Sequence, residues 1–190
     1  MENFNPYLEK IDLTYWRDLC QREGRLRHYE AGEFFLEAGK VARFMGYVQS
    51  GSLKYTVNDS EGNEHVINLE PEGGFASDFP NSLYGIPSKV SVIATSPCEI
   101  YCVPTAALRS RISTDPEFKF IVAKTTEQIF EQVYSRLIES YTISPRERYQ
   151  QLVAKYPYLF EIFQLQDIAS FLRITPTHLS RIRKETTSDK

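Results

Sequence analysis

The sequence contains few of the residues that form disulfides or bind metals. Only three cysteines and three histidines occur among its 190 residues. An odd number of cysteines without paired spacing argues against a disulfide framework and for a reducing compartment. Cys98 and Cys102 fall on one face of an expected strand and Cys20 lies far from them, so we expect three buried, structural thiols.

Patterns that carry catalysis are also absent from the sequence. It shows no nucleophile–base pair and no phosphate-binding glycine loop. A metal-dependent barrel enzyme would need clustered histidine and carboxylate ligands on facing strands, whereas His28 and His65 are not in an H-x-H arrangement. We therefore expect no enzyme, with no catalytic residues, no metal site and no cofactor.

Long apolar runs are missing as well. No stretch approaches the roughly 20 residues that a membrane-spanning helix requires. The opening residues, MENFNPYLEK, lack the basic segment and apolar stretch of a signal peptide. We therefore expect a cytoplasmic protein with no membrane partner.

Charge is unevenly distributed along the chain. The net charge is −3, but from Arg146 onward eight Lys and Arg stand against five Asp and Glu, which leaves 14 against 20 in residues 1–145. An acidic body with a basic end fits a protein that contacts phosphates with one small part. Uneven surface charge without a function is the alternative interpretation at this point.

Short β-branched and aromatic segments fill residues 24–103 and are separated by turn signals such as Ser50-Gly51. Strands at roughly ten-residue spacing are typical of an antiparallel sandwich or jelly roll. A short helix over Leu13–Arg22 is expected to cover this barrel. The predicted strands are Phe34–Leu36, Phe44–Gln49, Ser52–Asn58, Glu64–Leu69, Val90–Thr95 and Glu99–Val103.

A long helix is predicted after the barrel, from about Asp115 to Tyr141. Thr114-Asp115-Pro116-Glu117 has the form of a capping box, and no Gly or Pro follows until Pro145. Such a helix would be roughly 40 Å long, more than one small barrel covers. We expect one apolar face against the barrel and the other against a second copy, while a helix lying wholly on its own domain is the alternative. The predicted dimer-helix residues are Val122, Ile129, Phe130, Val133 and Leu137.

A helix-turn-helix is predicted near the C-terminus. A second capping box, Ser144-Pro145-Arg146-Glu147, starts a new helix and marks a hinge. Leu165–Leu172 follows as a short amphipathic helix, Arg173-Ile174-Thr175 as a turn, and Pro176 to about Lys184 as a second helix. An ordinary helical hairpin with a solvated basic face is the alternative. The expected small core consists of Ile168, Ala169, Leu172, Ile174, Leu179 and Ile182.

The chemistry of the second helix suits DNA. Arg181 can donate a bidentate pair to guanine O6 and N7, worth about 1–3 kcal/mol of discrimination. Ser180 and Thr177 can bond to bases or phosphates. Arg183 and Lys184 are natural phosphate contacts; His178 contacts a phosphate or is simply exposed.

These motifs together resemble the Crp/Fnr superfamily of cyclic AMP receptor-like regulators. The barrel resemblance rests on Tyr29-Glu30-Ala31-Gly32-Glu33, on Gly39, on Val48-Gln49-Ser50-Gly51-Ser52-Leu53-Lys54 and on Gly62-Asn63-Glu64. The block Leu179-Ser180-Arg181-Ile182-Arg183 is similar to the family's recognition helix. The resemblance implies that Ser180 and Arg181 contact bases and that Thr177 occupies the position usually held by a base-reading Glu.

The region that would bind the cyclic nucleotide departs from the family pattern. Family members use a Glu for the ribose and, about ten residues on, an Arg for the phosphate. Here Asp78, after Ser77, stands for the Glu, Ser88 stands where the Arg should be, and Lys89 points to the opposite face. We therefore expect a degenerate pocket with weak or no cyclic AMP binding, open to another ligand or to none. Only Cys20 lies in the first 97 residues, which argues against the N-terminal cysteine cluster of the family's iron–sulfur sensors, and haem stays open without a convincing axial ligand.

The DNA-binding end departs from the family pattern in two ways. Arg173 stands where relatives often have Gly, and a left-handed residue would cost Arg roughly 1 kcal/mol, so we expect a turn of slightly different shape. The family's C-terminal β-hairpin wing is expected to be missing, which makes dimerisation more important for affinity.

We therefore predict an α+β fold made of an antiparallel β jelly-roll barrel resembling cyclic-nucleotide-binding domains, a long dimerisation helix and a small helix-turn-helix domain. The predicted domains are residues 1–113, 114–143 and 144–190. The predicted function is a homodimeric, sequence-specific DNA-binding transcription regulator, with double-stranded DNA as partner and an unidentified small molecule as effector. The alternative is a small-molecule-binding barrel that does not bind DNA.

Overall fold

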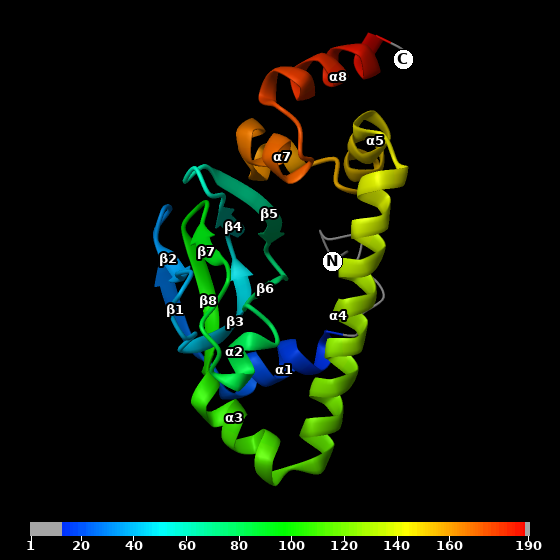
Figure 1. Ribbon diagram of the computed structural model, residues 1–190. Helices are drawn as coiled ribbons and strands as arrows, with labels where there is room; N and C mark the ends of the chain where they lie inside the picture. The colour runs from blue at the N-terminus through cyan, green and yellow to red at the C-terminus, as the bar shows by residue number, and fades with distance from the viewer. Residues whose placement is uncertain (1–12, 189–190) are drawn as a thin grey trace.

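The computed structural model of the chain describes residues 13–188. Figure 1 shows a β-barrel, a long helix beside it and a group of short helices at one end. The strands are β1 (Arg25–Tyr29), β2 (Phe34–Leu36), β3 (Phe44–Ser50), β4 (Ser52–Asn58), β5 (Glu64–Pro71), β6 (Phe75–Ala76), β7 (Ser91–Ala94) and β8 (Cys98–Pro104). The helices are α1 (Thr14–Glu23), α2 (Asn81–Tyr84), α3 (Thr105–Thr114), α4 (Pro116–Thr142), α5 (Pro145–Lys155), α6 (Leu159–Ile162), α7 (Leu165–Phe171) and α8 (Pro176–Ser188).

The strands form two antiparallel four-stranded sheets, in the orders β1-β8-β3-β6 and β2-β7-β4-β5. Side chains that alternate inward from both sheets meet in one apolar core, in which Val48, Leu53, Val92 and Ile100 are fully buried. The antiparallel barrel predicted from the sequence is therefore confirmed, together with six of its strands.

Two strands were not predicted. Strand β1 is an edge strand whose first four residues are exposed, so it lacks the alternating apolar pattern that marks a half-buried strand. Strand β6 has only two residues. Helix α3 was missed as well, because only Thr105 and Leu108 of its ten residues are buried.

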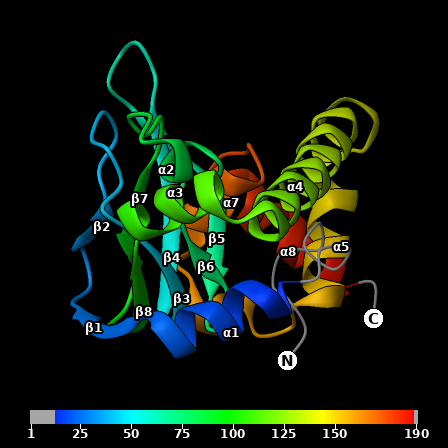
Figure 2. The same cartoon turned by 90° about the horizontal axis from the view of Figure 1, so that it is seen from below.

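Helices α1 and α3 lie across one end of the barrel, and the start of α4 packs against them (Figure 2). Trp16 of α1 donates from Nε1 to Thr125 Oγ1 of α4 (2.9 Å) and stacks edge-on to Phe118. The predicted capping box would make Thr114 the N-cap of α4. In the structure the N-cap is Asp115. Its side chain accepts from the Phe118 N–H (3.0 Å) and thereby satisfies one donor of the first turn.

Helix α4 has one face turned to its own chain and one turned to solvent. Phe118, Val122, Thr125 and Gln132 are buried along the inner face. Val122 was predicted as a dimer-helix residue, but it is 1% exposed and packs within the chain, so that part of the prediction is wrong. Ile129 is half-buried. Large apolar side chains remain exposed on the second half of the helix: Phe130, Val133, Tyr134, Leu137, Ile138 and Tyr141.

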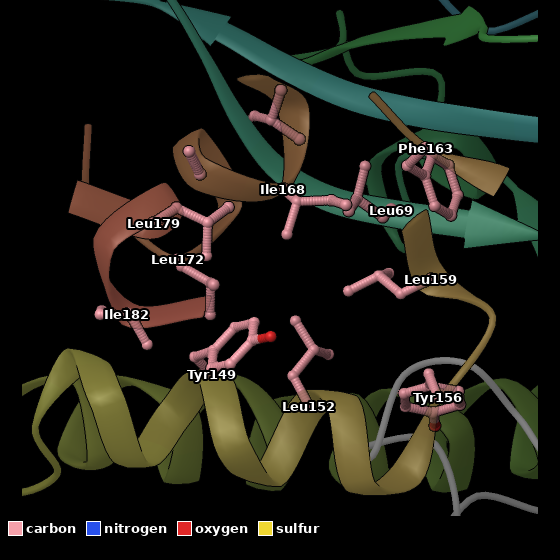
Figure 3. Packing of buried hydrophobic residues seen from close by; sticks show 12 residues of the cluster. Leu69, Tyr149, Leu152, Tyr156, Leu159, Phe163, Ile168, Leu172, Leu179 and Ile182 are labelled. Atoms are coloured by element: carbon pink, nitrogen blue, oxygen red, sulfur yellow. The ribbon is translucent and has the colours of Figure 1, made fainter. Parts of the chain in front are cut away.

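The four C-terminal helices share one apolar core with the barrel. Figure 3 shows Leu69 of β5 pointing toward Ile168 of α7 and Leu159 of α6, above Leu152 of α5. Val66 of β5 belongs to the same cluster and is 5% exposed. The apolar core of the predicted domain 144–190 thus includes side chains from the barrel.

Candidate nucleic-acid interface

Helices α7 and α8 form the predicted helix-turn-helix. Ile168, Leu179 and Ile182 are buried between them, and Ala169 is fully buried where the two helices approach. Leu172 is buried in the same core and Ile174 packs against it. The core predicted from the 3.6-residue pattern is therefore confirmed.

The ends of these helices are held by local hydrogen bonds. Ser144 and Glu147 form the predicted capping box at the start of α5. At the start of α8, Thr175 Oγ1 accepts from the His178 N–H (3.2 Å), as expected of an N-cap threonine. These caps end the connecting loops at defined residues and so fix the direction in which α8 leaves the turn.

The turn between α7 and α8 contains a left-handed arginine. Arg173 has φ +57°, so it adopts the left-handed conformation whose cost led us to expect a turn of slightly different shape. The Arg173 N–H donates to Ser170 O (2.9 Å) and the Ile174 N–H to Ala169 O (3.0 Å), the pattern of a Schellman motif. The motif satisfies two carbonyls at the end of α7, which compensates for the strain of a residue other than glycine.

Arg148 of α5 ties this turn to the end of α4. Its Nη1 donates to Ile143 O and its Nη2 to Leu172 O (3.1 Å). Sequence analysis missed this residue, because nothing in a single arginine on a helix indicates which carbonyls it reaches. The guanidinium joins the hinge after α4 to the helix-turn-helix and so restricts their relative rotation.

The residues predicted to read bases lie on the solvent side of α8. Thr177 and Arg181 are exposed, and Ser180 is half-buried. The Arg181 side chain is 70% exposed and has only a long contact from Nε to Glu185 Oε1 (3.9 Å). At that distance and exposure the ion pair contributes little, so the guanidinium can turn toward another acceptor.

The residues predicted to contact phosphates lie nearby on the same helix. Arg183 and Lys184 are exposed and His178 is half-buried. The Arg183 guanidinium lies 4.0 Å from the centroid of the Phe160 ring of α6, which orients it by a cation–π contact. The structure thus gathers all six predicted DNA contacts on one helix.

Among the residues of the predicted degenerate pocket, Ser77, Asp78, Ser88 and Lys89, two donate hydrogen bonds to the Asp78 carboxylate. Ser88 Oγ donates to Asp78 Oδ2 (2.9 Å), and the Lys89 N–H donates to the same oxygen (3.1 Å). Ser88 is buried, whereas the Lys89 side chain is exposed and cannot replace the missing Arg inside the pocket. The residues that stand for the ribose and phosphate ligands of the family are therefore bonded to each other.

A buried carboxyl group lies close to this segment. Glu70 of β5 is 4% exposed and accepts from the Phe75 N–H (3.1 Å) and Asn68 Nδ2 (2.8 Å). Burial raises the pKa of Glu70 to about 7. The Ser77 N–H donates to the buried Tyr55 hydroxyl (3.0 Å). Glu70 is a buried carboxyl group near this segment, and the Lys89 side chain points to solvent. This combination does not favour a bound phosphate.

The thiols and acidic groups offer no second site. All three cysteines are buried, and burial raises the pKa of Cys20 to about 12 and that of Cys102 to about 11, so the thiols stay protonated. Within residues 13–188, no cluster of three His, Cys, Asp or Glu is arranged to hold a metal ion. No helix in that range is long and apolar enough to cross a membrane.

Comparison with known proteins agrees with this geometry. Residues 26–115 match the family model of the cyclic nucleotide-binding domain. No curated protein sequence matches the chain. Among solved structures, FixK2 from Bradyrhizobium japonicum superimposes with a TM-score of 0.75 at 13% identity, over 87% of this chain and 85% of that one.

Two further structures cover almost the entire chain. A candidate transcriptional regulator of the Crp/Fnr family from Eubacterium rectale superimposes with a TM-score of 0.71 at 14% identity, over 99% of this chain and 89% of that one. A candidate cAMP-binding regulatory protein from Silicibacter pomeroyi gives 0.68 at 20% identity, over 97% and 85%. At these identities the similarity concerns the fold.

The left-handed turn makes a testable prediction about stability. Arg173→Gly should raise the free energy of unfolding by about 1 kcal/mol relative to Arg173→Ala, because only glycine adopts a positive φ without strain. Both variants lose the same side chain, so urea denaturation compares the backbone cost alone. Equal midpoints for the two variants would contradict a left-handed residue 173.

Proposed function

We propose that this chain, which has the fold of the Crp/Fnr regulators and carries a cyclic nucleotide-binding domain at residues 26–115, is a homodimeric transcription regulator that binds specific DNA sequences. The observation that carries the proposal is the recognition helix α8. Leu179 and Ile182 anchor this helix in the core, while Thr177 and Arg181 remain open to solvent. A helix held in this way can enter a major groove without losing its packing.

The proposed roles follow from the chemistry of the side chains. Arg181 would donate to a guanine, with Thr177 and Ser180 contacting neighbouring bases. Arg183, Lys184 and His178 would contact phosphates and set the register on the duplex. The location we propose is the cytoplasm, where the DNA of such regulators lies.

Dimerisation is proposed through the exposed face of α4. Phe130 and Leu137 are 67% and 48% exposed, and Val133, Tyr134 and Tyr141 continue the same stripe. A contiguous apolar stripe of this length on one helix is typical of an interface between two copies. Two recognition helices would then read half-sites about 34 Å apart.

The effector is proposed to be a small molecule other than cyclic AMP, because Asp78 and Ser88 are satisfied by each other and Glu70 is buried nearby. Regulators of this fold are generally not enzymes, and we propose no catalytic residue. The alternative is a small-molecule-binding protein that does not bind DNA. It would be favoured if in vitro selection recovered no bound DNA sequence.

The base-reading role of Arg181 is tested by in vitro selection of bound DNA, followed by variants. Arg181→Ala should weaken binding to the selected site by about 10- to 100-fold and relax the preference at one base pair, since a bidentate contact is worth about 1–3 kcal/mol. Lys184→Ala is the control and should weaken all sequences alike. Unchanged specificity in Arg181→Ala would refute its assignment, and a wild-type chain that selects no site would refute the function.

The dimer is tested by introducing charge into the exposed stripe. Phe130→Glu and Leu137→Glu should convert a dimer into a monomer of 22.0 kDa in sedimentation experiments, because a charge cannot be buried unpaired between two helices. Ile86→Glu replaces an exposed apolar residue of the barrel and should leave the dimer intact. A wild-type chain that sediments as a monomer at micromolar concentration would exclude this interface.

The expectation of weak or no cyclic AMP binding is tested by titration calorimetry with cyclic AMP. We expect no saturation below about 1 mM, since no buried cation faces the phosphate and Asp78 would repel it. Circular dichroism of the same sample confirms that the barrel is folded. A micromolar dissociation constant would show that the pocket rearranges to accept the nucleotide.

A further inference from the structure

The helix-turn-helix is attached to the outer edge of the barrel by apolar contacts. Val66 and Leu69 of β5 are 5% and 0% exposed, and they belong to the same cluster as Ile168 and Leu152 (Figure 3). Strand β5 is the last strand of its sheet, so α7 takes the place that another strand would fill.

Two polar contacts complete this attachment. Lys54 Nζ of β4 donates to Asp167 Oδ1 of α7 (3.1 Å) and to Glu64 Oε1 (2.8 Å). The Lys54 and Asp167 side chains are 17% and 9% exposed, so this ion pair is shielded from solvent. The Val66 N–H, on the free edge of β5, donates to Ser170 Oγ of α7 (2.8 Å).

These contacts face away from the proposed DNA-binding surface. Asp167 and Ser170 lie on the side of α7 that meets the barrel, whereas Thr177 and Arg181 of α8 are exposed. Helix α8 shares its core with α7, so the attachment of α7 sets the direction of α8 relative to the barrel and α4. Figure 1 shows α8 at the far end of the molecule in this arrangement.

We propose that Lys54, Asp167 and Ser170 are positioning residues that lock the recognition helix in its DNA-binding orientation. This inference rests on the proposed function. Its physical basis is that the apparent dissociation constant equals the intrinsic one divided by the fraction of molecules in the competent arrangement. Contacts that raise this fraction increase DNA affinity without touching DNA.

Lys54 is adjacent in sequence to Tyr55, whose hydroxyl contacts residues 75–77 beside the predicted pocket. Lys54 and Tyr55 are neighbours on β4 and point to opposite sides. The Tyr55 hydroxyl lies inside the barrel, where it donates to Phe75 O and accepts from the Ser77 N–H. A ligand that moved residues 75–77 would therefore shift strand β4 directly beneath the lock.

Lys54→Met and Asp167→Asn test the lock through DNA affinity. Each should weaken binding to the selected site about tenfold, within the usual range of coupling between sites, and the double variant should be no weaker than either single variant. Asp167→Asn removes a negative charge, which by itself would favour DNA. The matched control Glu37→Gln removes the same charge from an exposed ion pair with Lys40 on the barrel and should bind at least as tightly as wild type.

Hydrogen exchange at the Val66 amide tests the lock without DNA. Ser170→Ala and Lys54→Met should speed this exchange about tenfold or more, while the Val92 amide in the barrel centre keeps its rate. Faster exchange together with weaker DNA binding supports the proposal. Unchanged or tighter DNA binding, or unchanged exchange, overturns it. If the wild-type chain binds no DNA, the proposed function fails, and the exchange rate still decides whether the lock exists.

Discussion

The outer edge of strand β5 is where the barrel and the C-terminal helices pack together. An outer strand leaves backbone groups without a strand partner. Here the Ser170 hydroxyl of α7 accepts from one of them, and apolar side chains of α7 pack against the strand. Helices α6 and α7 have four and seven residues, too few to be stable alone in water. They persist because their apolar faces pack on each other, on α5 and on Leu69. The barrel is thus both a neighbour of the helical end and part of its core.

Helix α4 supplies the second connection and has to satisfy two surfaces at once. Its first half is fixed by the hydrogen bond from Trp16 to Thr125 and by Phe118 in the core beneath α1. Its second half leaves the barrel and presents aromatic and aliphatic side chains to solvent. The apolar residues of this helix are divided between contacts within the chain and a solvent-exposed stripe, which explains why a continuous apolar pattern on α4 does not correspond to a single face.

Features encoded locally could be predicted from the sequence. The capping box at Ser144, the N-cap Thr175 and the spacing of Leu179 and Ile182 each involve residues a few positions apart, and the structure has them as expected. The six predicted strands follow from their β-branched and aromatic residues and from the turn signals between them. Strand β1 was missed because its first four residues are exposed and lack an alternating apolar pattern, and the left-handed Arg173 was missed because the motif around it overrides the preference of the residue.

Long-range contacts could not be predicted in the same way. Nothing in the pattern of β5 distinguishes Val66 and Leu69 from ordinary barrel residues, and only the fold brings them to Ile168, about one hundred positions away. The same holds for Lys54, for Arg148 and for the buried Glu70. The substitution of Ser88 for an arginine was visible, but its bond to Asp78 depends on how residues 78–88 curl back on themselves.

The burial of the thiols has a practical side. All three cysteines of the chain lie in the interior with pKa values above their usual range, so thiol-directed dyes and spin labels will react with them slowly. A single cysteine introduced at an exposed position would therefore be the preferred point of attachment, without removal of the native ones. Pairs of such labels, one on the barrel and one on α8, would measure the distance between the barrel and the C-terminal helices in solution.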